Sequence, residues 1–188
     1  MIKKILLDMD GTICDFCNAA LKLWGTDLNR AKEHWRPRDY KLERALDVSQ
    51  KEFYDKIEKE GERFWTNLKP YTWANELYSL CCSIAPTCIC TDVGQFSGAF
   101  TGKIKWIKKN LENLDHDDYF KHYMVTPRKE FAASPTTLLI DDDLKKVSSF
   151  RLGGGQAILF PRYWNPNYKL ENKAYEYTER ILNRITKN

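Results

Sequence analysis

The stretch Ile5–Thr12, which reads Ile-Leu-Leu-Asp-Met-Asp-Gly-Thr, places two carboxylates directly after an apolar run. Such a run is typical of a buried β-strand, and Gly11 permits a sharp turn where the strand ends. Because strand side chains alternate between faces, Asp8 and Asp10 would share one face and Met9 would pack on the other. Two like charges this close need a cation. Mg²⁺ suits them, since it prefers oxygen ligands and keeps positions open for water and phosphate.

An Asp-x-Asp-Gly sequence also occurs in calcium loops and in simple polar turns. The EF-hand loop requires further acidic ligands and a Glu at its twelfth position, whereas Ile13, Cys14, Phe16 and Cys17 follow here. A calcium loop therefore does not fit, and a polar turn after a strand is the alternative that the motif alone leaves open.

Three further β-prone segments share the pattern of an apolar run that ends in polar side chains. They are Thr87–Thr91 followed by Asp92, Tyr119–Thr126 followed by Arg128 and Lys129, and Thr136–Ile140 followed by Asp141 and Asp142. In open parallel α/β sheets, ligands bind outside the carboxyl ends of the strands. The sequence therefore predicts a parallel sheet whose strand ends converge on one site.

The stretch between the first two strands is too long for a simple crossover. It contains three segments with helical character and charged outer faces, Ala19–Trp24, Arg30–Trp35 and Gln50–Phe64. We therefore predict an α/β, Rossmann-like core formed by residues 1–15 and 71–188, with a small helical cap, residues 16–70, inserted after the first strand. A cap of this kind excludes water and contributes to substrate recognition.

The rest of the predicted core alternates helices with a last strand. The expected elements are helices Trp73–Cys82, Lys103–Leu111 with Trp106 inward, Leu144–Phe150 with Asp143 as N-cap, and Glu171–Thr186 with Ala174, Thr178, Ile181 and Ile185 on one face, and a strand Ala157–Phe160. Two glycine-containing stretches are not nucleotide fingerprints. Residues 98–104 resemble a phosphate loop but are one residue short and lack its Ser/Thr, and residues 153–155 precede a strand instead of opening a helix.

In chain order, the motifs Asp8/Asp10, Thr91, Lys129 and Asp141/Asp142 resemble the four motifs of haloacid dehalogenase (HAD) superfamily phosphatases across nearly the whole chain. Within that superfamily the chain is most similar to the 5'(3')-deoxyribonucleotidases. The supporting stretches are residues 8–11 with 15–16, residues 63–70, residues 89–91, Gly102-Lys103 with Trp106-Ile107, and residues 138–142.

Two departures from the family pattern concern the phosphate pocket. Family members tend to carry Ser-Pro after the strand-end Thr, where this chain has Asp92-Val93. An acid beside a phosphate pocket would disfavour a dianionic ligand unless it points away or binds a cation. The family's Thr-basic-Asp-Lys is here residues 126–129, Thr-Pro-Arg-Lys, so Arg128 would be displaced from the usual phosphate-contacting place.

The resemblance implies a Mg²⁺-dependent phosphomonoesterase that works through an aspartyl-phosphate. Asp8 would be the nucleophile, and Asp10 would protonate the leaving group and then activate water. Thr91 and Lys129 would bind phosphate oxygens, because phosphoryl transfer depends mainly on positioning and charge stabilisation. The implied metal ligands are Asp8, Asp10 through its backbone carbonyl, and Asp142, with Asp141 as the competing candidate.

The resemblance also implies a nucleotide substrate, most closely a deoxyribonucleoside monophosphate. Phe16 matches the family position that packs against the base, with Trp35, Phe64 and Trp65 as further candidate walls; Asp92 and Arg128 complete the candidate substrate-binding residues. An aromatic slot would bind a base by stacking. Four alternatives stay open: a phosphatase for a sugar phosphate, one for a polynucleotide 3'-phosphate, a nucleotide-binding protein with a relic site, and a structural metal site.

Composition is that of an ordinary globular protein. The chain has 188 residues, 43% of them hydrophobic, and a net charge of +4, which would help to attract phosphorylated substrates. No signal peptide precedes the first strand and no run approaches the length of a membrane span. We expect a cytoplasmic protein with a small-molecule partner and neither a membrane nor a stable nucleic-acid partner; a homodimer is left open.

Six cysteines occupy positions 14, 17, 81, 82, 88 and 90. Cys14-x-x-Cys17 lacks the second pair or the histidine cluster that a zinc site requires. We therefore expect reduced, buried thiols, which also favours a reducing compartment.

Overall fold

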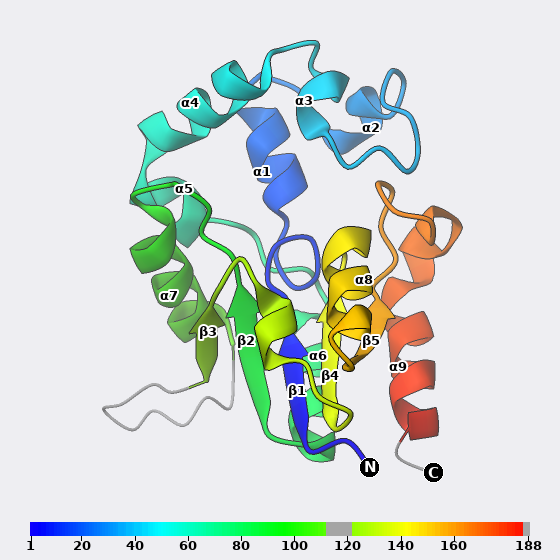
Figure 1. The fold of residues 1–188 in the computed structure, drawn as a ribbon. Helices are drawn as coiled ribbons and strands as arrows, with labels where there is room; N and C mark the ends of the chain where they lie inside the picture. The colour runs from blue at the N-terminus through cyan, green and yellow to red at the C-terminus, as the bar shows by residue number, and fades with distance from the viewer. Residues whose placement is uncertain (112–121, 186–188) are drawn as a thin grey trace.

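The computed structural model describes residues 1–111 and 122–185, and its centre is a five-stranded parallel sheet (Figure 1). The strands follow the spatial order β3-β2-β1-β4-β5. Their bounds are β1 Lys4–Leu7, β2 Thr87–Thr91, β3 Tyr123–Val125, β4 Thr137–Asp141 and β5 Gln156–Leu159. The predicted α/β fold with a parallel sheet is confirmed, and β1 lies at its centre between β2 and β4.

The strands lie close to where the apolar runs predicted them. β2 has the predicted bounds, whereas β4 begins one residue later than expected and extends to Asp141. The strand predicted over Tyr119–Thr126 is observed as β3, and residues 119–121 of that prediction lie outside the described residues.

Helices cover both faces of the sheet (Figure 1). In the second half of the chain they are α6 Ala74–Ile84, α7 Ala99–Asn110, α8 Leu144–Leu152 and α9 Ala174–Ile185, with the 3₁₀ turns η1 Lys129–Ala132 and η2 Tyr168–Lys173. On one face of the sheet Leu6 packs with Phe150 of α8. On the other, Ile5 and Leu7 belong to a larger core with Leu77 of α6. The strand alternation that separates Leu6 from its neighbours also places Asp8 on the α8 side.

Five short helices connect β1 to α6. They are α1 Phe16–Lys22, α2 Leu28–Ala31, α3 Leu42–Ala45, α4 Gln50–Glu60 and α5 Glu62–Thr66. Figure 1 shows α1 to α4 beyond the carboxyl ends of the strands, while α5 lies against α7. The assignment of residues 16–70 to a cap, with residues 1–15 and 71–188 as the core, stays a prediction.

The single helix predicted over Gln50–Phe64 is wrong, because the chain breaks at Gly61. This residue has φ +57°, a left-handed conformation that glycine adopts without steric cost, so α4 ends and α5 begins there. The helix predicted over Arg30–Trp35 is shifted toward the N-terminus. The Asp27 carboxylate accepts the backbone N–H groups of residues 29 and 30 and so starts α2 earlier.

The closing helix also differs in detail from its prediction. Its predicted first turn, from Glu171, belongs to η2, and predicted Thr186 lies outside the described residues. The buried face of α9 consists of Ala174, Thr178 and Leu182, whereas Ile181 and Ile185 are only half-buried. Tertiary packing on α6 therefore selects a face rotated from the one that the apolar residues indicated.

The cysteine prediction is correct in part. All six cysteines are free thiols; Cys14, Cys17, Cys81 and Cys90 are buried as predicted, whereas Cys88 is only half-buried. Cys82 is exposed, contrary to the prediction, because consecutive helix residues point about 100° apart and its neighbour Cys81 takes the core-facing position in α6. None of the helices that the structure describes has both the length and the apolar character needed to cross a bilayer.

Candidate active site

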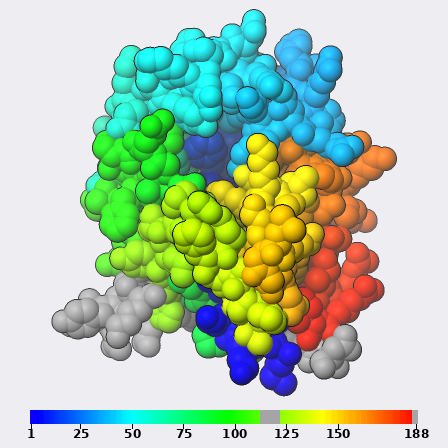
Figure 2. All heavy atoms as spheres, viewed as in Figure 1, coloured from blue at the N-terminus to red at the C-terminus, as the bar shows by residue number. Residues whose placement is uncertain are grey.

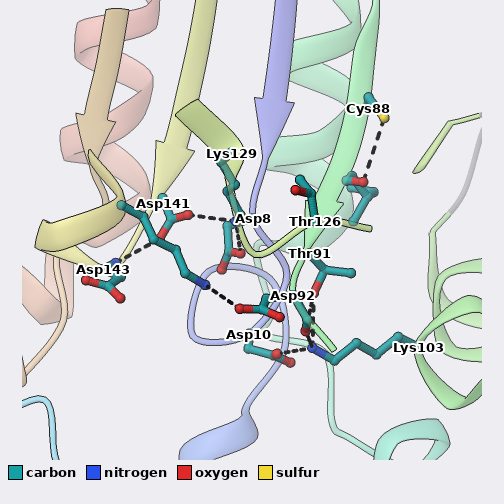
Figure 3. A network of polar contacts seen from close by, with 12 residues as sticks. Asp8, Asp10, Cys88, Thr91, Asp92, Lys103, Thr126, Lys129, Asp141 and Asp143 are labelled. Atoms are coloured by element: carbon teal, nitrogen blue, oxygen red, sulfur yellow. Dashed lines mark hydrogen bonds and ion pairs between the residues drawn. The ribbon is translucent and has the colours of Figure 1, made fainter. Parts of the chain in front are cut away.

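The carboxyl ends of β1 and β4 bring Asp8 and Asp141 to the same lysine. Lys129, at the start of η1, is fully buried; its ammonium donates to Asp8 and to Asp141 Oδ2, the latter at 2.7 Å. Figure 3 shows Lys129 between the two carboxylates. Burial alone would lower the pKa of Lys129, but Asp141 and Asp8 together raise it above its ordinary value. The lysine is therefore held as a buried cation at the strand ends.

Asp8, Asp141 and Asp142 form a cluster that could hold a metal ion. Each offers a carboxylate oxygen, these oxygens lie within 4.8 Å of one another, and all three residues are buried. Burial and then the charge of Asp8 raise the pKa of Asp141 to about 6, and the same two causes raise that of Asp142. A divalent cation relieves such crowding, and an all-oxygen donor set suits Mg²⁺. The three residues thus fit the predicted metal.

Asp10 points away from this cluster and pairs with a lysine that the sequence analysis did not select as a site residue. The Lys103 ammonium, on α7, donates to the Asp10 carboxylate, to Thr91 Oγ1 at 3.0 Å and to the backbone carbonyl of Asp92. Lys103 is only 1% exposed. A signal was present: Lys103 stands three and four residues before Trp106 and Ile107, so it shares the buried face of α7.

Asp92, the extra acid beside the phosphate pocket, has partners. Its Oδ1 accepts the Gly94 N–H at 2.8 Å, and its Oδ2 lies 3.9 Å from the Lys146 ammonium. Lys146 comes from the first turn of α8 and lines the same cavity. Burial and the charge of Lys129 lower the pKa of Lys146, but Asp8, Asp141 and Asp92 outweigh them and raise it. The chain therefore compensates Asp92 with a cation that the sequence analysis missed.

Formal charge at the strand ends matches a divalent ion. The acids are Asp8, Asp10, Asp92, Asp141 and Asp142, and the lysines in contact with them are Lys103, Lys129 and Lys146. Two negative charges are thus left over within this group of described side chains. One Mg²⁺ ion carries the charge that would balance them.

A cavity of about 700 Å³ opens above these residues. Figure 2 shows the hollow between the cyan residues of the α3–α4 region and the green and yellow segments that follow β3 and β4. Of the predicted site residues, those that line it are Asp8, Asp10, Phe16, Trp35, Trp65, Asp92 and Asp142. Polar carboxylates thus form its floor and aromatic rings part of its wall.

Phe16 lies in the aromatic wall as its position after Asp10 suggested. Its ring stacks on Trp65 at 5.6 Å and meets Phe64 edge-on at 5.7 Å. Phe64 does not line the cavity and packs behind Phe16 instead. Arg128 also does not line the cavity, because its side chain pairs with Glu130 and lies over the Phe131 ring. The structure therefore separates these two predicted substrate-binding residues from the others.

Glycine is required at position 11 because the Asp142 carboxylate lies very close to its backbone. It has φ +76°, and a Cβ at this position would collide with the Asp142 carboxylate. The loop after β1 can therefore reach Asp142 only with glycine here.

Residues 161–165, which follow β5, were missed by the sequence analysis. Trp164 lines the cavity and donates its indole N–H to Asp142 Oδ2 at 2.6 Å. A signal was available, since a run of polar and aromatic residues follows the predicted last strand, at the edge of the sheet where the other motifs end.

Comparisons with known proteins find similar solved structures but no similar sequence family. No protein-family model and no curated protein matches the sequence. A HAD family hydrolase from Deinococcus radiodurans R1, solved with bound phosphate and sodium, has 16% identity and a TM-score of 0.57, over 91% of this chain and 87% of that one. A haloacid dehalogenase-like protein of unknown function from Agrobacterium tumefaciens str. C58 has 13% identity and a TM-score of 0.52, over 84% and 82%. A hydrolase from Streptococcus pneumoniae TIGR4 has 13% identity and a TM-score of 0.50, over 90% and 98%.

These likenesses cover most of each chain, and at this level of identity they establish the fold. This chain has the α/β fold of HAD family hydrolases.

Proposed function

We propose that this chain is a Mg²⁺-dependent phosphomonoesterase of the HAD superfamily. The observation that carries the proposal is the buried group of Asp8, Asp141 and Asp142, held together by Lys129, of which Asp8 and Asp142 line a cavity of about 700 Å³. The phosphate bound in the structure from Deinococcus radiodurans supports it, since that protein shares the fold. Ammonium groups and carboxylates held together in one site are suited to phosphoryl transfer, which relies on positioning and charge.

The nucleophile in this proposal is Asp8. A carboxylate oxygen of Asp8 attacks phosphorus, the bond from phosphorus to the ester oxygen breaks, and Asp10 donates a proton to the departing alkoxide. Asp10 then takes a proton from water as the water oxygen attacks the aspartyl-phosphate, which releases inorganic phosphate and restores Asp8. Lys103, which contacts both Asp10 and Thr91, is placed to stabilise the charge of a phosphate oxygen next to the general acid.

We assign Asp142 to the metal and Asp141 to Lys129. Both carboxylate oxygens of Asp141 are already engaged, one by Lys129 and the other by the Asp143 backbone N–H at 2.8 Å. Asp142 instead lines the cavity next to Asp8. Mg²⁺ held by Asp8, Asp142 and the Asp10 carbonyl would supply positive charge to the phosphate and to the carboxylates around it.

The substrate that we propose is a deoxyribonucleoside monophosphate. Phe16, Trp35 and Trp65 line the cavity together with the acidic floor, so an aromatic base and a phosphate could be held at once. Stacking of a base on an aromatic side chain contributes about 1–3 kcal/mol. A sugar phosphate would leave this wall without a partner.

Replacing Phe16 by Ala tests the base slot. We expect KM for the preferred deoxyribonucleotide to rise about tenfold, because one stacking face is lost, while hydrolysis of a small ester such as glycerol phosphate changes little. Steady-state phosphate release measures both values. Phe100→Ala is the matched control, since Phe100 is exposed on α7 and does not line the cavity. Equal effects of Phe16→Ala on both substrates would refute the slot and favour a sugar phosphate; activity confined to 3'-phosphorylated oligonucleotides would favour the polynucleotide alternative.

A further inference from the structure

Residues 161–165 form a strap that holds two parts of the active site. The Arg162 guanidinium donates through Nε to the Gly11 carbonyl. Trp164 donates its indole N–H to Asp142 Oδ2 at 2.6 Å, and Asn165 donates Nδ2 to the Asp142 backbone carbonyl at 2.9 Å. All three strap residues are buried. The strap therefore fixes Asp142 by its side chain and by its main chain.

The Arg162 guanidinium anchors the strap among aromatic rings. Its Cζ lies 4.0 Å from the centroid of Tyr71, 5.0 Å from Trp73, 5.1 Å from Phe160 and 5.9 Å from Trp164. No carboxylate pairs with it among the residues that the structure describes. Ring faces stabilise a desolvated guanidinium, and the Gly11 carbonyl accepts one of its N–H groups. Trp164 is thus one of four aromatic rings that pack around this guanidinium.

The segment from α2 to α3 rests on the same strap. The Trp35 ring stacks on Trp164 with centroids 5.9 Å apart and planes 21° from parallel. The Tyr163 hydroxyl donates to the Trp35 carbonyl at 2.7 Å, and the Arg38 N–H donates to the Tyr163 carbonyl at 2.9 Å. Trp164 therefore contacts an aromatic wall residue with its ring and a candidate metal ligand with its N–H.

We propose that Trp164 is a positioning residue for the metal site, acting through Asp142, an inference that rests on the proposed Mg²⁺-dependent function. The indole N–H donates to Oδ2 of the Asp142 carboxylate and restricts rotation of the carboxylate, and the other oxygen would be the one available to a metal ion. Hydrogen bonds that orient a ligand in this way commonly change metal affinity, by about tenfold to a hundredfold when removed. Trp164 also lines the cavity beside Trp35, so the side chain that orients the metal ligand is at the same time part of the cavity wall.

Trp164→Phe tests the inference, because it keeps an aromatic ring and removes the N–H. We expect the dissociation constant for Mg²⁺ alone, measured by titration calorimetry on the full chain, to rise about tenfold to a hundredfold. Trp35→Phe is the matched control. It makes the same change in the other ring of the stack, but the Trp35 N–H has no hydrogen-bond partner among the described residues, so Mg²⁺ affinity should stay within about twofold. Trp164→His, which retains a ring N–H, should recover part of the affinity.

The outcomes separate this inference from the proposed function. If the wild-type protein does not bind Mg²⁺, the metal-dependent function itself is wrong. If the wild type binds Mg²⁺ and Trp164→Phe binds it equally well, only the role of Trp164 is overturned. Should the variant not fold, the wild type still provides a test by NMR of its 6 tryptophan indole N–H groups. One indole proton bonded to a carboxylate must shift when Mg²⁺ is added, and the absence of any shift contradicts the inference.

Discussion

Replacing Asp8 by Asn is expected to lower phosphatase turnover by about ten-thousandfold or more, the magnitude typical of a lost covalent nucleophile. The carboxamide occupies the same space but cannot attack phosphorus to form the acyl phosphate. Asp8 also lies in the crowded carboxylate cluster with Asp141 and Asp142, so the neutral side chain relieves repulsion and the variant should fold. The measurement is kcat at saturating Mg²⁺, with the unfolding temperature recorded in parallel.

Asp143→Asn is the control for this experiment. Asp143 follows the same acidic run but caps α8, where its Oδ1 accepts the Lys145 N–H at 2.7 Å, as predicted. Asn is as good an N-cap as Asp, so turnover should stay near that of the wild type. Retained turnover in a folded Asp8→Asn variant would instead show that another group is the nucleophile.

Replacing Lys129 by Met is expected to destabilise the protein by about 3–5 kcal/mol, the usual cost of removing one partner from a buried ion pair. Met has a similar length and is apolar, so the loss reflects the carboxylates left behind and not a large cavity. Asp8 and Asp141 would lose an ammonium that both contact. Urea unfolding without Mg²⁺ measures the change. Lys105→Met breaks an ion pair with Glu62 that is exposed, and it should leave the unfolding free energy nearly unchanged.

The loss in Lys129→Met should be smaller at pH 5 than at pH 7.5. Burial and Asp8 already raise the pKa of Asp141 to about 6 in the folded protein, and removal of the ammonium would raise it further. As the pH falls through this range, the folded variant takes up protons that its unfolded state does not, which favours its folding. The effect is larger in the variant than in the wild type, because the pKa of Asp141 is raised further in the variant. An equal loss at both pH values would show that the carboxylates are not the source of the instability.

The sequence predicted the strand ends because their signals are local. An apolar run that stops at a polar residue indicates both the strand and its end, so the sequence alone predicts that Asp8, Thr91 and Asp141 lie at one edge of the sheet, as the strand pairing confirms. The break of the predicted long helix at Gly61 could not be inferred in the same way. Glycine inside a helical pattern is tolerated in many helices, and the contacts of α5 with α7 decide its conformation here.

The residues that were missed depend on contacts between distant segments. Lys103 reaches Asp10 from 93 positions along the chain, and Trp164 reaches Asp142 from a strap beyond β5. The sequence signals for these two residues, the buried face of α7 and the polar and aromatic run after the last strand, do not say which carboxylate each side chain meets. Phe64 and Trp65 show the opposite problem, since adjacent aromatic residues on a short helix point in different directions and only the fold decides that Trp65 faces the cavity.

Phosphate release by the wild-type protein, measured with and without Mg²⁺ on a panel of deoxyribonucleoside and ribonucleoside monophosphates, sugar phosphates and a 3'-phosphorylated oligonucleotide, is the most direct test of the proposed phosphatase. We predict release that requires Mg²⁺, that is highest with deoxyribonucleoside monophosphates and that is absent with Asp8→Asn. Failure of the folded, Mg²⁺-saturated protein to release phosphate from every monoester in the panel would contradict the assignment of Asp8, Asp10, Lys129 and Asp142 to catalysis.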